Sequence, residues 1–472
     1  MRSEDLPDHN LKLPRKKPKP PEPQKHLWFD GWMSANGSAL KGLIEATTKF
    51  ISHHEEHTGT RIRKRRPVDQ AVHLRSIDAL VCALAHAVLV PPPTGRIAVK
   101  LGHAGKGQSR YDSPVFGKAL SPLVHLLSDL DFLNLKRSTL RGEVSSIAPS
   151  PWFAQKVGEF GVQLADFGRH QDEEVISLTC NAKRYSGWAD DRIGTLYREP
   201  IDYNDTPTTT KYRAELRTLN EFLKKAEIDF LDDGLEPRVD PFDRRMRRRF
   251  IILPDQQVRF NQGGRLFGGF WQQLKRERRS HIRINAEPVV VLDYGSMFTR
   301  LAYAVIGKEP PDGDLYAIPG YEGYRSGIKL AMNALLFDKS PRRSKWPKEI
   351  GIGVGDDEDA KMDRRGSAAQ YEARLPTGST VKKVRDATLS VHPHLSKAWG
   401  RQLGYQLMFL ESEIMVEVLR QLANRRIPAL GLHDGLLVSS SKATEAAGVM
   451  REVGREKSGL LLPVTQNEPE EE

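Results

Sequence analysis

The feature that most constrains this chain is an apolar run that ends in an aspartate and occurs twice. Residues 289–292, Val-Val-Val-Leu, precede Asp293, and residues 430–432, Leu-Gly-Leu, precede His433 and Asp434. Short apolar runs of this kind favour buried strands. Two strands that each present one carboxylate can hold a pair of divalent ions about 4 Å apart, as in phosphoryl and nucleotidyl transfer. The two aspartates are therefore the first candidate site.

The segment between the aspartates is predicted to contain a helix with a cationic and aromatic face. Four side chains follow one another at a spacing of four residues: Arg325, Lys329, Asn333 and Phe337. On a helix this spacing places them along one face. Two cations suit the phosphates of a nucleoside triphosphate, and an aromatic ring suits its base. An amphipathic helix with two solvated cations has the same spacing, so it is the position between the aspartates that favours nucleotide binding.

The order of these motifs resembles that of the family A DNA polymerases. Residues 289–307 look like motif A of that family, residues 325–337 like motif B, a helix of the fingers, and residues 430–438 like motif C. Residues 263–283 are similar to the segments that precede motif A. Phage-type single-subunit RNA polymerases share this palm, so the resemblance alone does not identify the sugar of the nucleotide.

The resemblance implies an α+β fold of the right-hand polymerase type. Its antiparallel palm sheet would carry Asp293 and Asp434, with helical fingers and a helical thumb beside it. By the same resemblance the two aspartates would bind two Mg²⁺ ions, with Mn²⁺ as an alternative. The partners would be a DNA primer-template and nucleoside triphosphates.

The resemblance also implies roles for individual side chains. Catalysis would depend on Asp293, Asp434 and Lys329. The nucleotide would be bound by six side chains: Arg325, Lys329, Asn333, Phe337, Phe298 and Tyr294. The nucleic acid would be contacted by four others: Arg265, Gln272, Arg283 and His433.

Three positions depart from the family pattern. Gly435 stands where these polymerases usually carry an acid after the His-Asp pair, Asn333 replaces an aromatic residue, and Phe298 replaces a Glu. Phe298 corresponds to the side chain that crowds the 2′ position of the incoming nucleotide. Because a phenyl ring offers no acceptor to a 2′-hydroxyl, we expect a preference for deoxynucleotides. In the alternative interpretation, Phe298 faces the palm core.

The chain is predicted to have four parts. Residues 1–25 are rich in Pro and Lys and are expected to be a disordered basic tail. Residues 26–165 would form an N-terminal domain, residues 166–250 a thumb-like helical region, and residues 251–472 the palm and fingers.

Local signals predict two helix starts before residue 250. Ser121-Pro122 and Thr206-Pro207 each place a capping residue before a proline, which is favoured at the first helical position. The second helix is expected to run to about Ala226. The first is followed by a strand, a basic turn and a strand over residues 132–147, an order that resembles a winged helix. An ordinary basic hairpin in a helical subdomain is the equally supported alternative.

Composition favours a polyanionic partner. The net charge is +11 and the pI about 9.4, and basic residues gather in three runs, residues 61–66, 244–249 and 275–279. The two cysteines, Cys82 and Cys180, exclude a disulfide framework and a cysteine zinc cluster. We recognise no apolar run of transmembrane length and no signal peptide, and therefore expect a cytoplasmic protein without a membrane partner.

Two other motifs are interpreted as structural. Residues 53–57, His-His-Glu-Glu-His, resemble a zincin site, but Thr58 occupies the position of the required second histidine, so a solvated helix is expected. Residues 351–355 are glycine-rich but lead into the acidic run 356–359, which makes a poor phosphate cradle. We expect a loop of the fingers there.

The leading hypothesis is a template-directed DNA polymerase without a proofreading exonuclease, serving DNA replication or repair. One alternative is an RNA polymerase or primase on the same palm. A second alternative is a DNA-binding regulator in which the palm is inactive.

Overall fold

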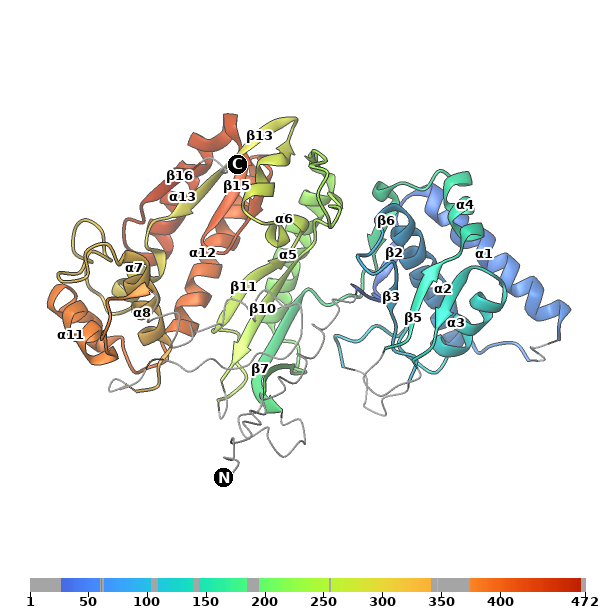
Figure 1. Ribbon diagram of the computed structural model, residues 1–472, viewed down its shortest axis with the longest axis horizontal. Helices are drawn as coiled ribbons and strands as arrows, with labels where there is room; N and C mark the ends of the chain where they lie inside the picture. The colour runs from blue at the N-terminus through green and yellow to red at the C-terminus, as the bar shows by residue number, and fades with distance from the viewer. Residues whose placement is uncertain are drawn as a thin grey trace, which may run out of the picture.

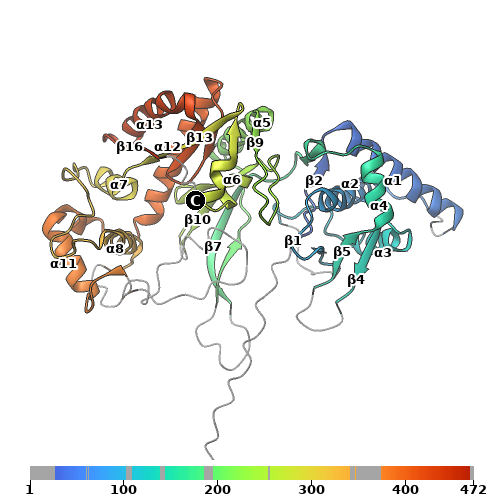
Figure 2. The same cartoon turned by 45° about the horizontal axis from the view of Figure 1, so that its top comes forward.

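The computed structural model describes residues 27–59, 61, 63–102, 109–138, 144–184, 195–253, 256–340, 346 and 374–467. These residues form a mixed α+β structure with a smaller N-terminal lobe and a larger lobe, which lie side by side (Figures 1 and 2). Each lobe has its own cluster of buried apolar side chains. The predicted tail, residues 1–25, and the predicted loop of the fingers, residues 351–359, lie outside the described residues.

The smaller lobe combines helices with a four-stranded sheet. Its helices are α1 Ser38–His57, α2 Pro67–Leu89, α3 Leu120–Asp129 and α4 Pro151–Glu159. Its strands, in spatial order, are β1 Leu27–Trp28, β3 Ile97–Ala98, β5 Ser146–Pro149 and β4 Leu133–Lys136. The helix α2 is central to the lobe, because Ile77, Leu80 and Leu84 have no exposed surface.

By length and composition alone, α2 could cross a membrane. In the structure, 61% of its most apolar stretch is buried, which makes α2 the core helix of the smaller lobe. The expectation that no apolar run reaches transmembrane length was therefore wrong. The physical reason for the apolar composition is burial within the lobe, where α2 contacts α1, α3 and α4.

The predicted order of helix, strand, turn and strand is present in the smaller lobe. The helix α3 is followed by β4 and β5, which pair antiparallel, while residues 139–143 of the turn lie outside the described residues. Because α3 begins at Leu120, with Ala119 before it, the expected cap at Ser121 was wrong. Pro122 is accommodated in the first turn, where backbone N–H groups have no partner within the helix. Nucleic-acid binding by this hairpin stays a prediction.

The larger lobe is built around a six-stranded antiparallel sheet. Its strands, in spatial order, are β14 Ala429–Gly431, β15 Gly435–Ser439, β13 Glu287–Tyr294, β12 Ile282–Ile284 and β9 Ile228–Phe230, with β16 Val464–Asn467 also paired to β13. The run that ends in Asp293 forms β13, and the run before Asp434 forms β14. An antiparallel sheet close to both aspartates was expected and is present.

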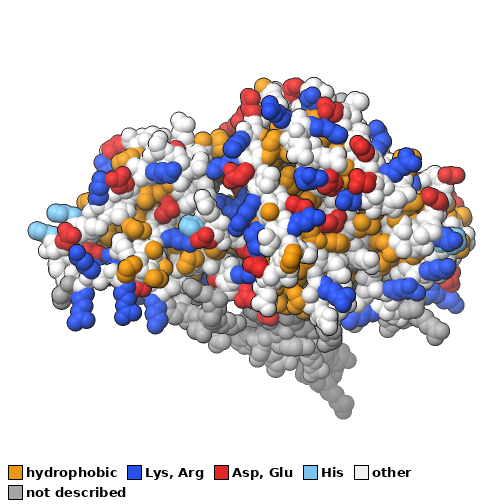
Figure 3. Space-filling view, turned by 180° about the vertical axis from the view of Figure 1, so that it is seen from behind, with side chains coloured by type: hydrophobic (Ala, Val, Ile, Leu, Met, Phe, Trp, Pro, Cys, Tyr) orange, Lys and Arg blue, Asp and Glu red, His pale blue; other side chains and the backbone are white. Residues whose placement is uncertain are grey.

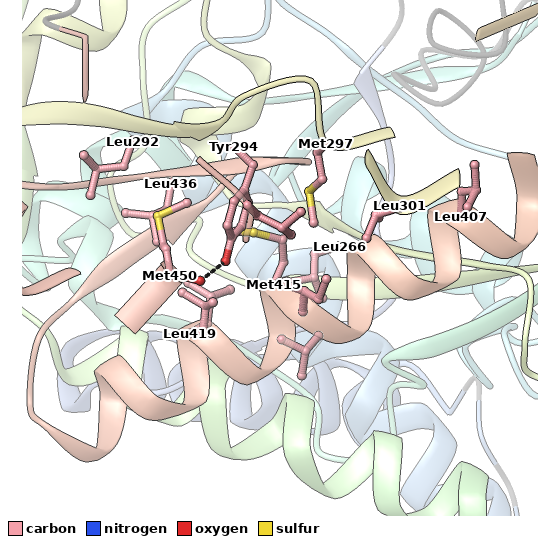
Figure 4. Packing of buried hydrophobic residues seen from close by; sticks show 14 of the residues in the cluster. Leu266, Leu292, Tyr294, Met297, Leu301, Leu407, Met415, Leu419, Leu436 and Met450 are labelled. Carbon is pink, nitrogen blue, oxygen red and sulfur yellow. Dashed lines mark hydrogen bonds between the residues drawn. The ribbon is translucent and has the colours of Figure 1, made fainter. Parts of the chain in front are cut away.

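Helices complete this lobe. They are α6 Phe270–Gln273, α7 Met297–Val305, α8 Arg325–Phe337, α11 Val381–Val391, α12 Gly404–Asn424 and α13 Ala443–Ser458. The helix predicted for residues 325–337 is confirmed as α8. Figures 1 and 2 both place α8 and α11 at the end of this lobe far from the smaller lobe. In Figure 4, Leu292 and Leu436 of the sheet pack with Leu419 of α12 and Met450 of α13.

A second sheet lies beside the first. Its order is β11 Gly263–Gly268, β10 Met246–Ile252, β7 Ile176–Arg184 and β8 Thr195–Pro200. The helix α5, Pro207–Lys225, packs on β7 and β10. The Thr206 hydroxyl accepts a hydrogen bond from the Thr209 amide at 3.2 Å, which confirms the predicted cap.

This sheet changes the expected domain organisation. Residues 166–250 were expected to form a helical region, but they contain strands as well as α5. The reason is that β7, which precedes α5 in the chain, pairs with β10, which follows it. The boundary expected near residue 165 falls just before β6, Phe167–Arg169, which pairs with β2, Met33–Ala35, of the smaller lobe. The boundary expected at residue 250 falls inside β10. A thumb role for this region stays a prediction.

The junction between the lobes contains a buried carboxylate that gathers three arginines. Glu173, only 3% exposed, accepts hydrogen bonds from Arg169 at 2.5 Å, from Arg247 at 2.7 Å and from Arg245. Arg169 also donates to Asp30 of the smaller lobe at 2.6 Å. A buried carboxylate that lost its cationic partners would be costly in free energy. These ion pairs therefore fix the position of β6 relative to β10.

The buried His73 of α2 predicts a pH-dependent stability. Burial, and then Arg65, lowers the pKa of His73 from 6.5 to about 4. Because the unfolded chain binds a proton that the folded lobe excludes, the free energy of unfolding decreases as pH falls from about 6.5 toward 4. We expect His73→Gln to flatten this decrease in thermal unfolding followed by circular dichroism. The exposed His57→Gln is the matched control, and an unaltered pH slope in His73→Gln would contradict the prediction.

Candidate metal and nucleotide site

The pairing of β13 with β15 brings the two aspartates together. Asp293 lies opposite Gly435 in the register, and the Tyr294 amide donates to the Asp434 carbonyl oxygen at 3.0 Å. The Leu432 amide donates to the Gly435 carbonyl at 2.8 Å, which closes a turn at positions 433 and 434 between β14 and β15. Asp434 was expected at the end of a strand and instead lies in this hairpin turn. The turn places it beside the end of β13.

The two carboxylates repel each other, and cations surround them. Burial, and then the charge of Asp434, raises the pKa of Asp293 to about 6. Arg276, Arg279 and Lys329 act in the opposite direction on the same carboxyl group. A positive charge from the helix α8 therefore acts at the end of the sheet, together with two cations from the segment before β12.

Gly435 explains one departure from the family pattern. A Cβ atom at this position would lie 1.9 Å from Asp293 Oδ1 and 2.5 Å from the Leu292 carbonyl oxygen. Both distances are far below any real contact, so the Asp293 carboxylate occupies the space that a side chain at 435 would need. In this geometry an acid at position 435 would displace Asp293.

The donor set fits Mg²⁺. Carboxylate oxygens are the ligands that Mg²⁺ prefers, and protein sites commonly supply one or two carboxylates while phosphates and water complete the octahedron. Asp293 and Asp434 provide two such groups at one point, where burial and then the charge of Asp434 raise the pKa of Asp293. Within the described residues no group of three or more His, Cys, Asp or Glu side chains could hold a metal ion.

On α8, the predicted row of side chains is less buried than the side of the helix that packs against the lobe. Lys329 is exposed, while Ile328 and Met332 are buried. The guanidinium of Arg325 forms a two-pronged ion pair with Asp314, at 2.7 and 3.0 Å. Asn333, in the middle of the row, has a buried Oδ1 without a hydrogen-bond partner in the described structure. A buried oxygen in this state is an acceptor available to a ligand.

An aromatic stack joins α7 to α8. The rings of Phe298 and Phe337 lie 5.8 Å apart and nearly parallel, and Tyr405 of α12 contacts Phe337 edge-on at 5.1 Å. The Arg265 guanidinium lies 5.5 Å from the centre of the Phe298 ring. The half-buried Phe298 ring thus contacts both Phe337 and Arg265, and all three were predicted site residues.

Glu411 is a site residue that sequence analysis missed. It is 1% exposed on α12 and accepts two hydrogen bonds from Arg265, at 2.6 and 2.9 Å. Burial raises the pKa of Glu411 to about 7; Arg265 opposes this rise, whereas Asp434 adds to it. The available signal was an acid at helical spacing between Met408 and Met415, on a face that is otherwise apolar. Glu411 thus holds Arg265, whose charge acts on His433, the neighbour of Asp434.

His433 is neutral at this site. Burial, and then Arg265 and Arg279, lowers the pKa of His433 to about 3. Its ring lies 5.4 Å from that of Phe267, and its Nδ1 is buried without a hydrogen-bond partner among the described residues. Arg276 and Arg279 belong to the basic run 275–279, which lies within the segment similar to the one before motif A but was not assigned site residues.

Three predicted residues are placed differently from expectation. Tyr294, expected to contact the nucleotide, is buried and donates from its hydroxyl to the Met450 carbonyl oxygen at 2.5 Å (Figure 4). The expectation is corrected, because side chains alternate along a strand and Tyr294 faces away from Asp293. Gln272 donates to the Gly431 carbonyl at 2.9 Å and so supports the β14–β15 hairpin. Arg283 lies opposite Pro288, at the other end of β13 from Asp293.

Comparison with known proteins adds little. No protein-family model and no curated protein matches the chain. Among solved structures it is similar to the POL domain of Pol1 from M. smegmatis, in complex with a DNA primer-template and dNTP, at 14% identity and a TM-score of 0.21. The match covers 43% of this chain and 45% of that chain. The chain therefore matches less than half of that structure, and a TM-score this low supports no conclusion about function.

The close approach of Gly435 to Asp293 predicts that a methyl group added at position 435 weakens metal binding. Gly435→Ala forces the Asp293 carboxylate to move, so Mn²⁺ binding measured by electron paramagnetic resonance should weaken on the order of 10- to 100-fold. Gly448→Ala on α13 is the control, because a Cβ there meets nothing within 4 Å. Equal Mn²⁺ affinity in Gly435→Ala and the parent protein would show that Asp293 is not a ligand in this position.

Proposed function

We propose that this protein is a DNA polymerase of the right-hand type, which adds deoxynucleotides to a primer 3′-hydroxyl and lacks a proofreading step. The observation that carries the proposal is the pairing of β13 with β15, which brings Asp293 and Asp434 to one point within reach of the charge of Lys329. A partly buried carboxylate whose pKa is raised by burial and by a second carboxylate, with cations acting on it, favours a reactive site over an ordinary strand end.

The palm of this polymerase would be the six-stranded sheet, and the fingers would be α8 and α11. Asp293 and Asp434 would hold Mg²⁺. When bound, Mg²⁺ at such a site lowers the pKa of a coordinated hydroxyl and stabilises charge on phosphate oxygens. The thumb role would belong to α5 and the sheet on which it packs. We propose a cytoplasmic location, because a chain of this length with two cysteines does not have the composition of a disulfide-rich secreted protein.

The cations of the site would bind the triphosphate. Lys329, on the exposed row of α8, would neutralise the charge that develops as pyrophosphate leaves. Arg276 and Arg279 act on the same Asp293 carboxyl group as Lys329, so a triphosphate bound there would meet cations from two segments of the chain. His433 remains neutral, because the pKa of its imidazole is held at about 3. It would donate or accept a hydrogen bond near the primer end without adding charge.

The aromatic stack favours a deoxyribose. The Phe298 ring packs on the Phe337 ring and also contacts the Arg265 guanidinium. A 2′-hydroxyl placed against this ring would lose its hydration without gaining an acceptor, at a cost of about 1–3 kcal/mol. The RNA polymerase and primase alternatives require the opposite preference.

Removal of either carboxylate is expected to abolish nucleotide addition without loss of DNA binding. Asp293→Asn and Asp434→Asn should each abolish extension of a labelled primer, because the ligands of the metal ions are removed. DNA affinity should stay nearly unchanged, since phosphate contacts dominate it. Asp229→Asn, at the exposed far edge of the same sheet, is the matched control. Extension at the parental rate by either aspartate variant would refute the proposed function, as would absence of extension by the parent protein.

Removal of the Phe298 ring predicts a change in sugar selection. The parent should prefer deoxynucleotides, and Phe298→Ala should narrow that preference roughly 5- to 150-fold, mainly through better use of ribonucleotides, as expected for about 1–3 kcal/mol. Phe298→Leu keeps most of the side-chain volume and should keep most of the preference. Primer extension with matched deoxy- and ribonucleotides measures both. A parent that already favours ribonucleotides would instead support the RNA polymerase alternative.

A further inference from the structure

The basic run at residues 244–249 leads into β10, Met246–Ile252, where the side chains alternate between the two faces of the strand. Arg244 is buried and donates to the carbonyl oxygens of Ala226 and Ile228, at 2.5 and 2.6 Å, just beyond the end of α5. Arg248 is also buried and donates to the Gly264 carbonyl at 2.8 Å. These two arginines satisfy backbone acceptors and stabilise the fold.

The other arginines of the run lie on the opposite side of β10. Arg247 is directly opposite Phe267 of β11, and Arg249 is directly opposite Arg265. Opposed residues of an antiparallel pair project from the same side of the sheet. We call these four residues the arginine face: Arg247, Arg249, Arg265 and Phe267.

The arginine face reaches the metal site. The Arg249 guanidinium lies 5.0 Å from the centre of the Phe267 ring, and that ring lies 5.4 Å from the ring of His433. His433 is adjacent to Asp434 in the hairpin turn. Since β11 is the edge strand next to this hairpin and β10 follows it, the cations extend away from the aspartates across the sheet.

The charges along this path are only partly balanced. Arg247 is half-exposed, and it shares its partner Glu173 with Arg169 and Arg245. Arg265 is paired with Glu411. Arg169 also pairs with Asp30, so two carboxylates serve three guanidiniums, and positive charge exceeds negative charge among these five side chains. In the rear view of Figure 3, Lys and Arg side chains lie among Asp and Glu over most of the surface, with a few Lys and Arg together at the lower left edge.

We propose that the arginine face binds the phosphate backbone of the duplex that leaves the metal site, an inference that rests on the proposed function. Guanidinium groups bind phosphates through paired N–H donors. Arg247 and Arg249 are two residues apart, about 6.8 Å along the strand, close to the separation of neighbouring phosphates on one nucleic-acid strand. The Phe267 ring is covered by Arg249 and only 9% exposed, so it offers no platform on which single-stranded bases stack.

The salt dependence of binding tests this proposal without any catalytic step. A labelled primer-template duplex is titrated with the full-length protein at several KCl concentrations, without nucleotide. Each lost phosphate contact should reduce the slope of log K against log[salt] by about 0.9 and weaken binding on the order of tenfold at low salt. We expect this for Arg247→Gln and for Arg249→Gln, and twice the change in slope for the double variant.

Arg420→Gln is the matched control. Arg420 is a partly exposed arginine with a carboxylate partner, Glu417, on α12, and it lies outside the arginine face. Its removal should leave the slope unchanged. If the double variant does not fold, Arg249→Gln decides the result, because it leaves the ion pairs of Glu173 in place.

The outcomes separate this inference from the proposed function. An unchanged salt slope in a folded Arg249→Gln variant of a parent that extends primers overturns the arginine face and leaves the proposed function standing. A reduced slope in a protein that never extends a primer leaves the arginine face standing and overturns the proposed function. Equal losses in the arginine variants and in Arg420→Gln would indicate only an effect of net charge and would also overturn the proposal.

Discussion

The close approach of β15 to the carboxylate at the end of β13 is the constraint on which the site depends. Because Gly435 has no side chain, the Asp293 carboxylate can lie where a Cβ would be, 1.9 Å from the ideal position of that atom. The same pairing holds the hairpin turn, and hence Asp434, beside Asp293. A position that looks like a lost acid in the sequence is therefore the condition under which the remaining two acids can meet.

The packing behind the sheet keeps this geometry rigid. Tyr294, the neighbour of Asp293, points the other way and binds the Met450 carbonyl of α13 among buried Leu and Met side chains. Trp271 and Gln272 both donate to the Gly431 carbonyl, so the β14–β15 hairpin is held from the side of β11. Tyr294 and Gln272, which were expected to contact the nucleotide or the nucleic acid, instead stabilise β13 and the β14–β15 hairpin.

Buried ion pairs add to the apolar packing. Glu411 joins α12 to Arg265 of β11 within one apolar cluster, and Glu173 joins β10 to Arg169 of β6 between the two lobes. Breaking such a pair leaves an uncompensated buried charge, at a cost of about 3–5 kcal/mol. Arginine therefore has two uses in this chain. Arg248 stabilises the fold, and its neighbours on the same strand, Arg247 and Arg249, lie on a face that leads to the metal site.

The sequence by itself determined the elements whose signals are local. Thr206 caps α5 through its own hydroxyl, the apolar run before Asp293 forms a strand, and the row from Arg325 to Phe337 forms one face of a helix. It did not determine where Asp434 lies in its hairpin, because the turn depends on pairing across the sheet. Only the tertiary structure decided that Tyr294 is buried, that Glu411 stands beside the site, and that residues 166–250 contribute strands to a second sheet. Each of these depends on partners far away in the chain, which periodicity and capping cannot reveal because they act within a few residues.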